Sequence, residues 1–494
     1  MTATITLTPA TAAFDADERI EVLGRTHFIG IGGAGMSVLA EMLHERGVAV
    51  DGSDRERSAK TDRLESLGIT VQFGQRAENV ADADTVVYSS AIKPSNPEIV
   101  AAAQRGARIV HRSDILALLM NGCRAVTVAG AHGKTTTSSM LSHVLVQTGK
   151  DPSYAIGGSI QGADGSTLDG GHVGAGDVLV AEADESDGSF DKYRPQIAII
   201  TNCEADHLDH YGDEAHYRAA FVRHASHAVG HVVLCADDAD VASKAVAYGT
   251  ADPNGLNLNG AAYVHIVSEQ ESAGSGVERF TLRMPAGIAG DQPRDIPVEL
   301  SVPGVHNARN AAAALTAAML LGVDADEAAK AITGFLGAAR RFQVRGTVKQ
   351  VTVVDDYAHH PTEIAALLDA ARRRYPESTI RVLFQPHLFS RTKFFAHEFA
   401  EALAKADDVI VTGVFPAREK QEDFPGVGPL SIAREAKGMQ GVEFSAQEDM
   451  RVAAQMMVMR AHHGDVIFTV GAGDITDMGP VMLHALEAHR EGCE

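Results

Sequence analysis

Cysteine is scarce in this chain of 494 residues, which has only four. Cys123, Cys203, Cys235 and Cys493 are scattered along the sequence, and no two of them form a C-x-x-C pair. This usage excludes a disulfide framework and suits a reducing compartment. Because 45% of the residues are hydrophobic, the chain can fill more than one core without a disulfide or a metal to hold it.

Long apolar runs and an excess of positive charge are also missing. No run approaches the roughly 18 apolar residues of a membrane span, and the N-terminus has no basic region followed by an apolar stretch. We therefore expect a cytoplasmic protein that is not inserted in a membrane. The 43 basic residues are outnumbered by 65 acidic ones, and the net charge of −22 argues against a nucleic-acid partner. The sequence does not indicate an oligomeric state.

The length and the order of the predicted elements indicate three α/β domains. Apolar and β-branched runs alternate with helical patterns along the chain, which favours largely parallel sheets. The Asn121-Gly122 turn and the stretch at 337–342 give candidate boundaries. The predicted domains are residues 1–121, 122–337 and 338–494, and the first twenty residues look like a loosely held arm.

The most informative stretch is RAVTVAGAHGKTTT at residues 124–137. An apolar strand turns through glycines into Lys134 and Thr135, where a helical pattern begins, so backbone N–H groups, a helix N-terminus and a lysine converge. This predicts a polyphosphate site, with the Thr135 hydroxyl available to a phosphate-bound Mg²⁺. Val128 replaces the first glycine of the common pattern, but a plain glycine turn would not explain a lysine followed by three threonines. The predicted nucleotide-binding residues of this loop are Gly130, Ala131, His132, Gly133, Lys134, Thr135 and Thr136.

Acidic residues follow the next two predicted strands. One strand ends at Glu182, and another leads into E-A-D-H at residues 204–207. Because parallel strands end at the same edge of a sheet, these side chains should lie near the phosphate loop and hold Mg²⁺ with ATP. Each of these acids, taken alone, is typical of a solvated loop charge. The coincidence of the phosphate loop, Glu182 and the E-A-D-H cluster favours a metal site. His207 among these acids also allows a zinc site, but only His210 lies near it at ligand spacing.

A second glycine turn lies near the N-terminus. Gly30, Gly32 and Gly35 satisfy G-x-G-x-x-G after an apolar strand. A predicted strand at 48–50, followed by acidic residues at 51 and 54, would complete a dinucleotide-binding pattern and leaves an NAD-dependent dehydrogenase as an alternative. A UDP-sugar would use the same turn for its diphosphate.

Other candidates stand at strand ends and helix starts. Ser89 and Ser90 follow an apolar strand and are either ligand contacts or turn caps. Asn307 and Asn310 share one face of a helix start, where they could read an adenine edge or cap the helix. Arg341, in an arginine pair at the second domain boundary, could reach a phosphate or remain solvated.

Seven motifs, in their order along the chain, closely resemble those of the Mur ligases. The resemblance covers nearly the whole chain after the N-terminal arm. The motifs are GIGGAGM from Gly30, GAHGKTTT from Gly130, EADESD from Glu182, TNCEADHLD from Thr201, PGVHNARN from Pro303, ARRF from Ala339 and DDYAHHP from Asp355. The resemblance implies the three-domain Mur ligase architecture, with an N-terminal Rossmann-like domain for a UDP-sugar, a central P-loop ATPase domain and a C-terminal Rossmann-like domain that helps bind the amino acid.

The resemblance also implies a reaction of peptidoglycan synthesis. ATP, UDP-N-acetylmuramate and L-alanine would react to give ADP, phosphate and the alanyl product. The lactyl carboxylate of the sugar would attack the γ-phosphate of ATP to form an acyl phosphate, from which the amine of alanine displaces phosphate.

Residue roles follow from the same resemblance. Lys134 would hold the β- and γ-phosphates, Thr135 and Glu182 would bind one Mg²⁺, and His207 would help hold a second. With Arg341, these make the expected catalytic set Lys134, Glu182, His207 and Arg341. The expected nucleotide contacts outside the phosphate loop are Asn307, Asn310, Arg341 and Asp356. The expected UDP-sugar contacts are Gly30, Gly32, Gly33, Gly35, Met36, Ser89 and Ser90. The expected amino-acid contacts are His359, His387 and Arg391, with Arg391 facing the alanine carboxylate.

The sequence departs from the family pattern at two places. Leu388 stands after the histidine of the Q-P-H motif, where arginine is expected, so the carboxylate clamp would rest on Arg391. Several sister ligases carry a carbamoylated lysine near the metal, whereas this chain has no lysine between Lys192 and Lys244. The metal must then be held by other groups.

Three alternative functions differ in their substrates. A murein-recycling ligase of the same superfamily would add a tripeptide to the same UDP-sugar. An NAD-dependent dehydrogenase would use the first glycine turn. A non-enzymatic ATP-binding switch would hydrolyse ATP without needing a sugar and an amino acid together.

Overall fold

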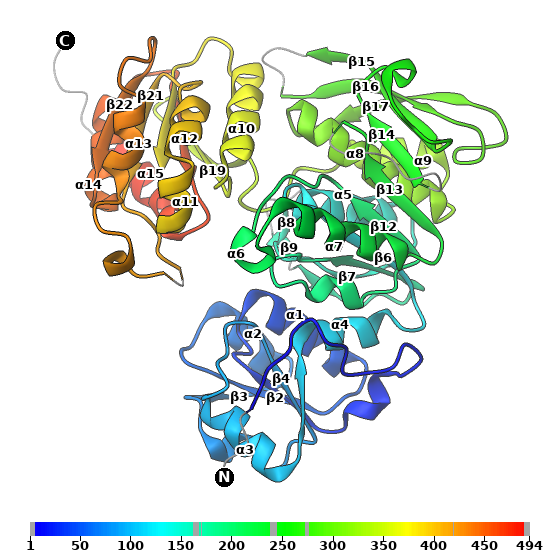
Figure 1. Cartoon of the computed structure of the whole chain (residues 1–494). Helices are drawn as coiled ribbons and strands as arrows, with labels where there is room; N and C mark the ends of the chain where they lie inside the picture. Colours follow the sequence, from blue (N-terminus) through cyan, green and yellow to red (C-terminus); the bar gives the residue numbers. More distant parts are fainter. Residues whose placement is uncertain are drawn as a thin grey trace. The chain divides into compact units, whose positions relative to one another are not determined.

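The structure is a computed structural model that describes residues 5–161, 167–168, 170–237, 245–271, 276–417 and 419–488 (Figure 1). The chain forms two compact units. The first is drawn from Met1–Val267, Thr281–Val298 and Arg309–Gly334, and the second from Ser268–Phe280, Glu299–Ala308 and Phe335–Glu494. The predicted alternation of strands and helices is confirmed, and most strand pairs are parallel.

The first unit begins with a five-stranded parallel sheet in the order β3-β2-β1-β4-β5. The central strands β1 and β4 are buried along their whole length, as expected where helices cover both faces of a sheet. The strands are β1 (Thr26–Ile29), β2 (Val50–Asp54), β3 (Thr70–Phe73), β4 (Thr85–Tyr88) and β5 (Arg108–His111). The helices are α1 (Ala34–Glu45), α2 (Ala59–Ser66), α3 (Pro97–Arg105) and α4 (Arg112–Met120), with short 3₁₀ turns η1 (Ile20–Leu23) and η2 (Ala77–Val80).

The N-terminal segment is held more firmly than predicted. Ile5 and Leu7 pack against a buried cluster under this sheet, and the backbone N–H of Ala13 donates to Asp114 at 3.1 Å. Both apolar side chains are partly buried in this position, and the area removed from water stabilises the attachment. The prediction of a loose arm is therefore wrong for these residues.

A ten-stranded sheet follows, in the order β10-β7-β11-β6-β12-β13-β14-β15-β16-β17. Strand β6 lies between β11 and β12 and runs parallel to both, so the three strands end at the same edge. The strands are β6 (Arg124–Ala129), β7 (Ser153–Ala155), β10 (Gly171–His172), β11 (Val178–Glu182), β12 (Ile197–Ile200), β13 (His231–Cys235), β14 (Ala245–Gly249), β15 (Ala262–Glu271), β16 (Glu278–Met284) and β17 (Arg294–Leu300), and β8 (Ile160–Gln161) pairs with β9 (Thr167–Leu168) separately. The helices are α5 (Lys134–Gln147), α6 (Leu208–Tyr211), α7 (Glu214–Ser226), α8 (Val305–Leu320) and α9 (Ala325–Ile332), with 3₁₀ turns η3 (Ser189–Lys192) and η4 (Pro253–Gly255).

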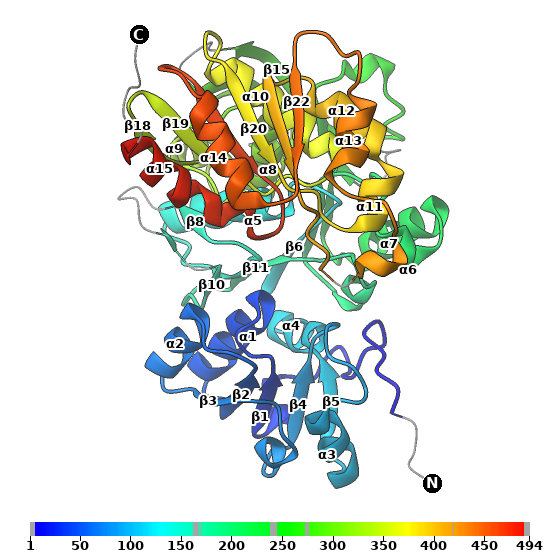
Figure 2. The same ribbon diagram turned by 90° about the vertical axis from the view of Figure 1, so that its left-hand side faces the viewer.

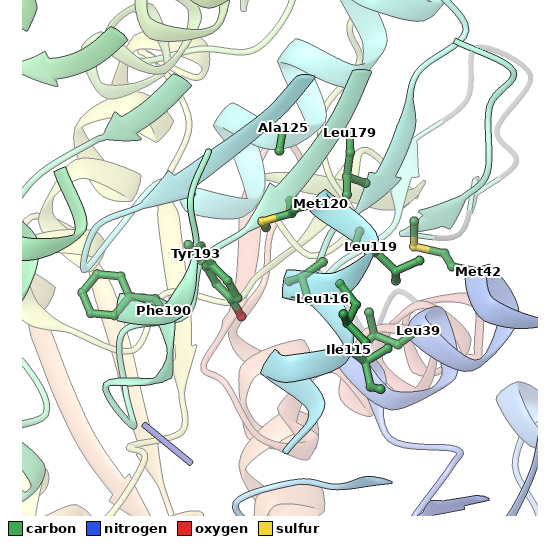
Figure 3. Close-up of a cluster of buried hydrophobic side chains, with 14 of the residues drawn as sticks. Leu39, Met42, Ile115, Leu116, Leu119, Met120, Ala125, Leu179, Phe190 and Tyr193 are labelled. Carbon is green, nitrogen blue, oxygen red and sulfur yellow. The ribbon is translucent and has the colours of Figure 1, made fainter. Parts of the chain in front are cut away.

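One hydrophobic core joins the two sheets of the first unit. Helices α1 and α4 contribute Leu39 and Leu119, which lie near Leu179 of β11 and Ala125 of β6 (Figure 3). All four side chains are at most 4% exposed. Because the core is continuous, the glycine turn before α1 and the phosphate loop after β6 belong to one packed body.

The second unit contains a six-stranded sheet in the order β18-β19-β23-β20-β21-β22, in which only the β18–β19 pair is antiparallel. Helices α14 and α15 cover one face, and α10, α12 and α13 cover the other (Figure 2). The strands are β18 (Gln343–Val348), β19 (Val351–Asp356), β20 (Ile380–Phe384), β21 (Asp408–Thr412), β22 (Glu443–Gln447) and β23 (Val466–Val470). The helices are α10 (Pro361–Arg374), α11 (Phe389–Phe394), α12 (Ala396–Leu403), α13 (Pro429–Glu435), α14 (Met450–Arg460) and α15 (Met478–Ala488), with 3₁₀ turns η5 (Gln421–Asp423) and η6 (Asp474–Asp477). Among the helices of the described ranges, none combines the length and apolarity needed to cross a membrane.

Candidate active site

The loop between β6 and α5 has the backbone of an anion-binding turn. Gly130 has φ of 138° and Gly133 has φ of 83°, both in the region that favours glycine. A Cβ atom on Gly130 would collide with the hydroxyl of Thr201, and one on Gly133 would lie 2.7 Å from Oδ1 of Asn310. Helix α5 begins at Lys134, so its first N–H groups point toward the loop.

Lys134 is held in place by oxygen atoms around its ammonium group. Its Nζ donates to the carbonyl of Gly130 at 2.6 Å and to Glu185 at 2.8 and 3.1 Å. Burial alone would lower the pKa of Lys134, but the carboxylates of Glu185 and Asp184 outweigh it and raise that pKa. The lysine is therefore a full positive charge at the turn. Glu185 is completely buried and was not among the predicted site residues, although it belongs to the E-A-D-E-S-D motif.

Thr135 and Glu182 come together as predicted from the strand order. The Thr135 hydroxyl donates to Oε1 of Glu182 at 2.7 Å, and the other carboxylate oxygen accepts from the backbone N–H of Gly157. A hydroxyl and a carboxylate at hydrogen-bond distance form an oxygen-only donor set, which is the set that Mg²⁺ prefers. These two residues fit a magnesium ion carried by a bound nucleotide.

His207 lies at the same edge of the sheet. It precedes α6 with φ of 52°, and its Nε2 is 3.7 Å from Glu185 and 3.7 Å from Asp206. The backbone N–H of His207 donates to the Asp206 carboxylate at 2.8 Å. The imidazole therefore faces the same carboxylate that holds Lys134. Its sequence neighbour His210 packs edge-on against Tyr211, with ring centroids 4.7 Å apart.

Asn202 fixes the middle of the phosphate loop. Its Oδ1 accepts from the N–H of His132 at 3.2 Å, while its Nδ2 donates to the His132 carbonyl at 2.9 Å. The His132 ring lies 3.3 Å from Glu204. Asn202 belongs to the TNCEADHLD motif but was not predicted as a site residue, because an amide in a loop carries no spacing signal. Thr136, in the first turn of α5, is buried.

The N-terminal glycine turn has the predicted strand-turn-helix form. It joins β1 to α1, whose first residue is Ala34. The strand predicted at 48–50 is present with shifted bounds, because β2 begins at Val50, includes Asp51 and ends at Asp54. Asp51 pairs with the buried His27 at 2.6 Å, and Asp54 accepts from the N–H of Gly32 at 2.7 Å. The two acids therefore stabilise the sheet and the turn.

The predicted sugar-site residues lie around this turn. Met36 is buried in α1, and Ser89 directly follows β4. The Ser90 hydroxyl lies 3.1 Å from the His111 ring and donates to Asp187 at 2.5 Å. Ser90 therefore contacts the segment that follows β11 as well as its own sheet.

A small cavity of about 70 Å³ opens between α1 and α2 on one side and the segment after β7 on the other. Its lining includes Ser37, Val38 and Arg63 from the helices. Gly157 and Gly158 line the opposite side, and Gly157 also contacts Glu182. The cavity therefore extends from the helix after the glycine turn toward the carboxylate beside the phosphate loop.

The second unit gathers the remaining predicted side chains. The guanidinium of Arg341 lies 5.3 Å from the ring centroid of Tyr357 and 3.6 Å from Glu363. Asp356 accepts from the N–H groups of Phe342 and Ala358 at 2.7 and 2.8 Å, and burial raises the pKa of Asp356 to about 6.

Glu363 also orders the histidines after β19. It accepts from the N–H of His359 at 2.9 Å and lies 3.3 Å from Nδ1 of that ring, although it was not predicted as a site residue. Burial lowers the pKa of His359 to about 3, so the ring is neutral. His387 lies 5.6 Å from His359 by ring centroids, and Arg391 is buried in α11. Leu388 directly precedes that helix and has a positive φ of 68°.

The two predicted asparagines differ in their contacts. Asn307 donates through Nδ2 to the carbonyl of Pro303 at 2.7 Å, which is a helix-start contact within the second unit. Asn310 belongs to the first unit and lies against Gly133 of the phosphate loop. The first unit thus brings together Lys134, Thr135, Glu182, His207 and Asn310, and the second brings together Arg341, Asp356, His359, His387 and Arg391.

Comparison with known proteins covers nearly the whole chain. Residues 25–124 match the model "Mur ligase family, catalytic domain", residues 128–318 match "Mur ligase middle domain" and residues 340–473 match "Mur ligase, glutamate ligase domain". A UDP-N-acetylmuramate–L-alanine ligase of Bifidobacterium longum subsp. infantis is 73% identical over 99% of each chain, and one of Renibacterium salmoninarum is 47% identical over 94% of this chain and 96% of the relative. The crystal structure of a UDP-N-acetylmuramate–alanine ligase from Thermotoga maritima superposes with a TM-score of 0.75 at 30% identity, covering 94% of this chain and all of the other. With three matching domain models and relatives of this identity along its full length, the chain belongs to the Mur ligase family.

Proposed function

We propose that this protein joins L-alanine to the lactyl carboxylate of UDP-N-acetylmuramate, with conversion of ATP to ADP and phosphate. The relatives that carry this activity in their names are similar over essentially the full chain. The structural observation that carries the proposal is the meeting of Lys134, Thr135 and Glu182 at one turn. The proposal includes the domain roles: residues 1–121 bind the UDP-sugar, 122–337 bind ATP, and 338–494 bind the amino acid. We expect this step of peptidoglycan synthesis to take place in the cytoplasm.

The reaction must overcome repulsion between two anions. A lactyl carboxylate oxygen attacks the γ-phosphorus, the new O–P bond forms as the bond to the bridging oxygen breaks, and ADP leaves. At 4 Å, two unit charges repel by about 4 kcal/mol at an effective dielectric of 20. Lys134 offsets this repulsion at the β- and γ-phosphates, and Arg341 supplies a second cation.

The second step forms the amide. The amine of alanine attacks the acyl carbon, the tetrahedral intermediate expels phosphate, and the amine proton passes to solvent. His359, His387 and Arg391 are assigned to the amino acid, and Arg391 to its carboxylate. Because Leu388 replaces the expected arginine, the guanidinium of Arg391 carries that contact alone.

Two magnesium ions complete the proposed site. Thr135 and Glu182 would hold one, and His207 would help hold the other. When bound, the ions would neutralise charge on the phosphates and on the acyl phosphate. The glycine turn at Gly30–Gly35 would bind the UDP diphosphate through its backbone N–H groups, with Ser89 and Ser90 nearby.

Coupled ADP release with UDP-N-acetylmuramate and a panel of amino acids tests the proposal. Release should require ATP, the sugar nucleotide and alanine together, and Lys134→Ala should lower it by several orders of magnitude. Faster turnover with the tripeptide than with alanine would support the recycling ligase instead. Equal phosphate release without the sugar would support an ATP switch, and a nicotinamide difference spectrum would support a dehydrogenase.

A further inference from the structure

Four acidic side chains in six residues divide between the two sheets of the first unit. Glu182, at the end of β11, and Glu185, in the segment after it, hold Thr135 and Lys134 at the phosphate loop. The two aspartates of the segment have partners in the N-terminal part of the unit. Asp184 pairs with Arg112 at 3.0 Å, and Asp187 accepts from Ser90.

Arg112 contacts both the segment after β11 and the N-terminal glycine turn. Its Nη2 donates to Asp184, while a Cβ atom on Gly35 would lie 2.5 Å from its Nη1. Gly35 is the third glycine of the N-terminal turn and lies in the first turn of α1. The guanidinium therefore lies directly against the turn that presents backbone N–H groups to a diphosphate.

Two neighbouring basic groups differ from Arg112 in their charge or in their pairing. Burial lowers the pKa of His111 to about 4, so its ring beside Ser90 is neutral. Arg63, the arginine next to α1 on α2, is bound by both oxygens of Glu41 at 2.6 and 3.0 Å. Arg112 is 29% exposed, and Asp184 is 44% exposed, so a ligand can reach the pair.

We propose that Arg112 is a diphosphate-binding residue that exchanges Asp184 for a phosphate oxygen when the sugar nucleotide binds. The inference rests on the proposed function, because it takes the glycine turn as the site of the UDP diphosphate. A planar guanidinium can donate two parallel hydrogen bonds to a phosphate, and the diphosphate carries more negative charge than the carboxylate it replaces. The shared core fixes the glycine turn relative to the segment after β11, so Arg112 can change partners without a movement of either sheet (Figure 3).

The exchange predicts opposite effects of two substitutions on UDP binding. Arg112→Gln should weaken the affinity for UDP about 10- to 100-fold, as expected for the loss of a charged hydrogen bond. Asp184→Asn removes the competing carboxylate and should tighten UDP binding several-fold. In the Arg112→Gln background, the same Asp184→Asn change should have no effect, because it acts through the arginine. A purely structural role would weaken binding in both single variants.

Calorimetric titration of the full chain with UDP, and ligand-observed NMR with uridine, complete the test. Arg112→Gln should leave uridine binding unchanged, since uridine has no phosphate, and Arg112→Lys should bind UDP with intermediate affinity. Arg25→Gln is the matched control: Arg25 pairs with Asp51 at 3.2 Å just before β1, at the other end of that strand from the turn, and its loss should not alter UDP binding. UDP binding by wild type together with an affinity of Arg112→Gln within twofold of it would overturn the assignment. Failure of wild type to bind UDP would overturn the proposed function as well.

Discussion

The ion pair of Lys134 and Glu185 allows a stability effect to be separated from a catalytic one. Glu185 is completely buried, and Lys134 is only 16% exposed on its side chain. Lys134→Ala leaves the carboxylate without its partner at 2.8 Å. Removing one member of a buried pair costs about 3–5 kcal/mol, because the remaining charge has no compensation. That is a large part of the roughly 5–15 kcal/mol by which a domain is stable.

The pH dependence of this loss has a definite sign. Burial raises the pKa of Glu185 above its ordinary 4.5, and Lys134 opposes that rise. In Lys134→Ala the pKa of Glu185 rises further, so the folded state keeps a proton that the unfolded state releases. The folded variant then binds more protons, and its stability falls as the pH rises above the unfolded value of 4.5.

A second substitution should restore stability without restoring activity. In the double variant Lys134→Ala/Glu185→Gln, a neutral amide replaces the uncompensated carboxylate, and most of the lost free energy of unfolding should return. ADP release should stay as low as in the single variant, because the Lys134 ammonium is still missing from the phosphates.

Hydrogen exchange of the α5 amides in urea measures the stability of the first unit directly. Arg218→Ala is the control, because Arg218 pairs with Glu214 at a similar 2.8 Å but both side chains are about half exposed. Its loss should change the free energy of unfolding by about 0–1 kcal/mol. A Lys134→Ala variant within about 1 kcal/mol of wild type, or a double variant no more stable than the single one, would refute the reasoning.

Three further predictions concern the rest of the site. Because the pKa of His359 is lowered to about 3, its imidazole nitrogen shifts should stay constant by NMR from about pH 5 to 8. The neutral ring should reduce the stability of the fold only as the pH falls below the unfolded pKa of 6.5. A titration midpoint near 6.5 in the folded protein would contradict this. Gly133→Ala places a Cβ at φ of 83° and 2.7 Å from Oδ1 of Asn310, so it should weaken ATP binding in calorimetry by about 1–2 kcal/mol, and unchanged affinity would contradict the geometry. Glu363→Gln should lower kcat/KM by roughly 10–100-fold with little change in thermal stability, because Arg341 and His359 lose a charged neighbour that they share. An unchanged kcat/KM would show that Glu363 does not contribute to the site.

The strand, glycine turn and helix around Lys134 could be predicted from sequence because the residues that form them are adjacent. The glycines, Lys134 and Thr135 are adjacent, and the strand before them fixes the direction of the turn. Glu182 could be found as well, since it ends a strand that lies beside β6. Glu185 could not be predicted, because the path of the loop after β11 brings it to Lys134, and spacing along the chain does not indicate that path.

The error at β2 has a related cause. Asp51 and Asp54 have low strand propensity and look like turn residues. Inside β2, Asp51 is only 7% exposed, and its charge is compensated by His27 from the neighbouring strand. Sequence propensity has no access to such a partner, so the predicted strand ended before the acids. Glu363 was missed for the same reason, since its role depends on residues that surround it only after folding.

The proposed phosphate-binding cations share one arrangement that reconciles a net charge of −22 with anionic substrates. Lys134 pairs with Glu185 at 2.8 Å, Arg112 with Asp184 at 3.0 Å, and Arg341 approaches Glu363 at 3.6 Å. A ligand with a single negative charge gains little by replacing a carboxylate that is already in place. A polyphosphate gains more, because it offers several charged oxygens to the same cation and to the N–H groups of the turn. Carboxylate partners therefore lower the affinity of these cations for simple anions more than for nucleotides, and selectivity for polyphosphates follows from the pairing itself.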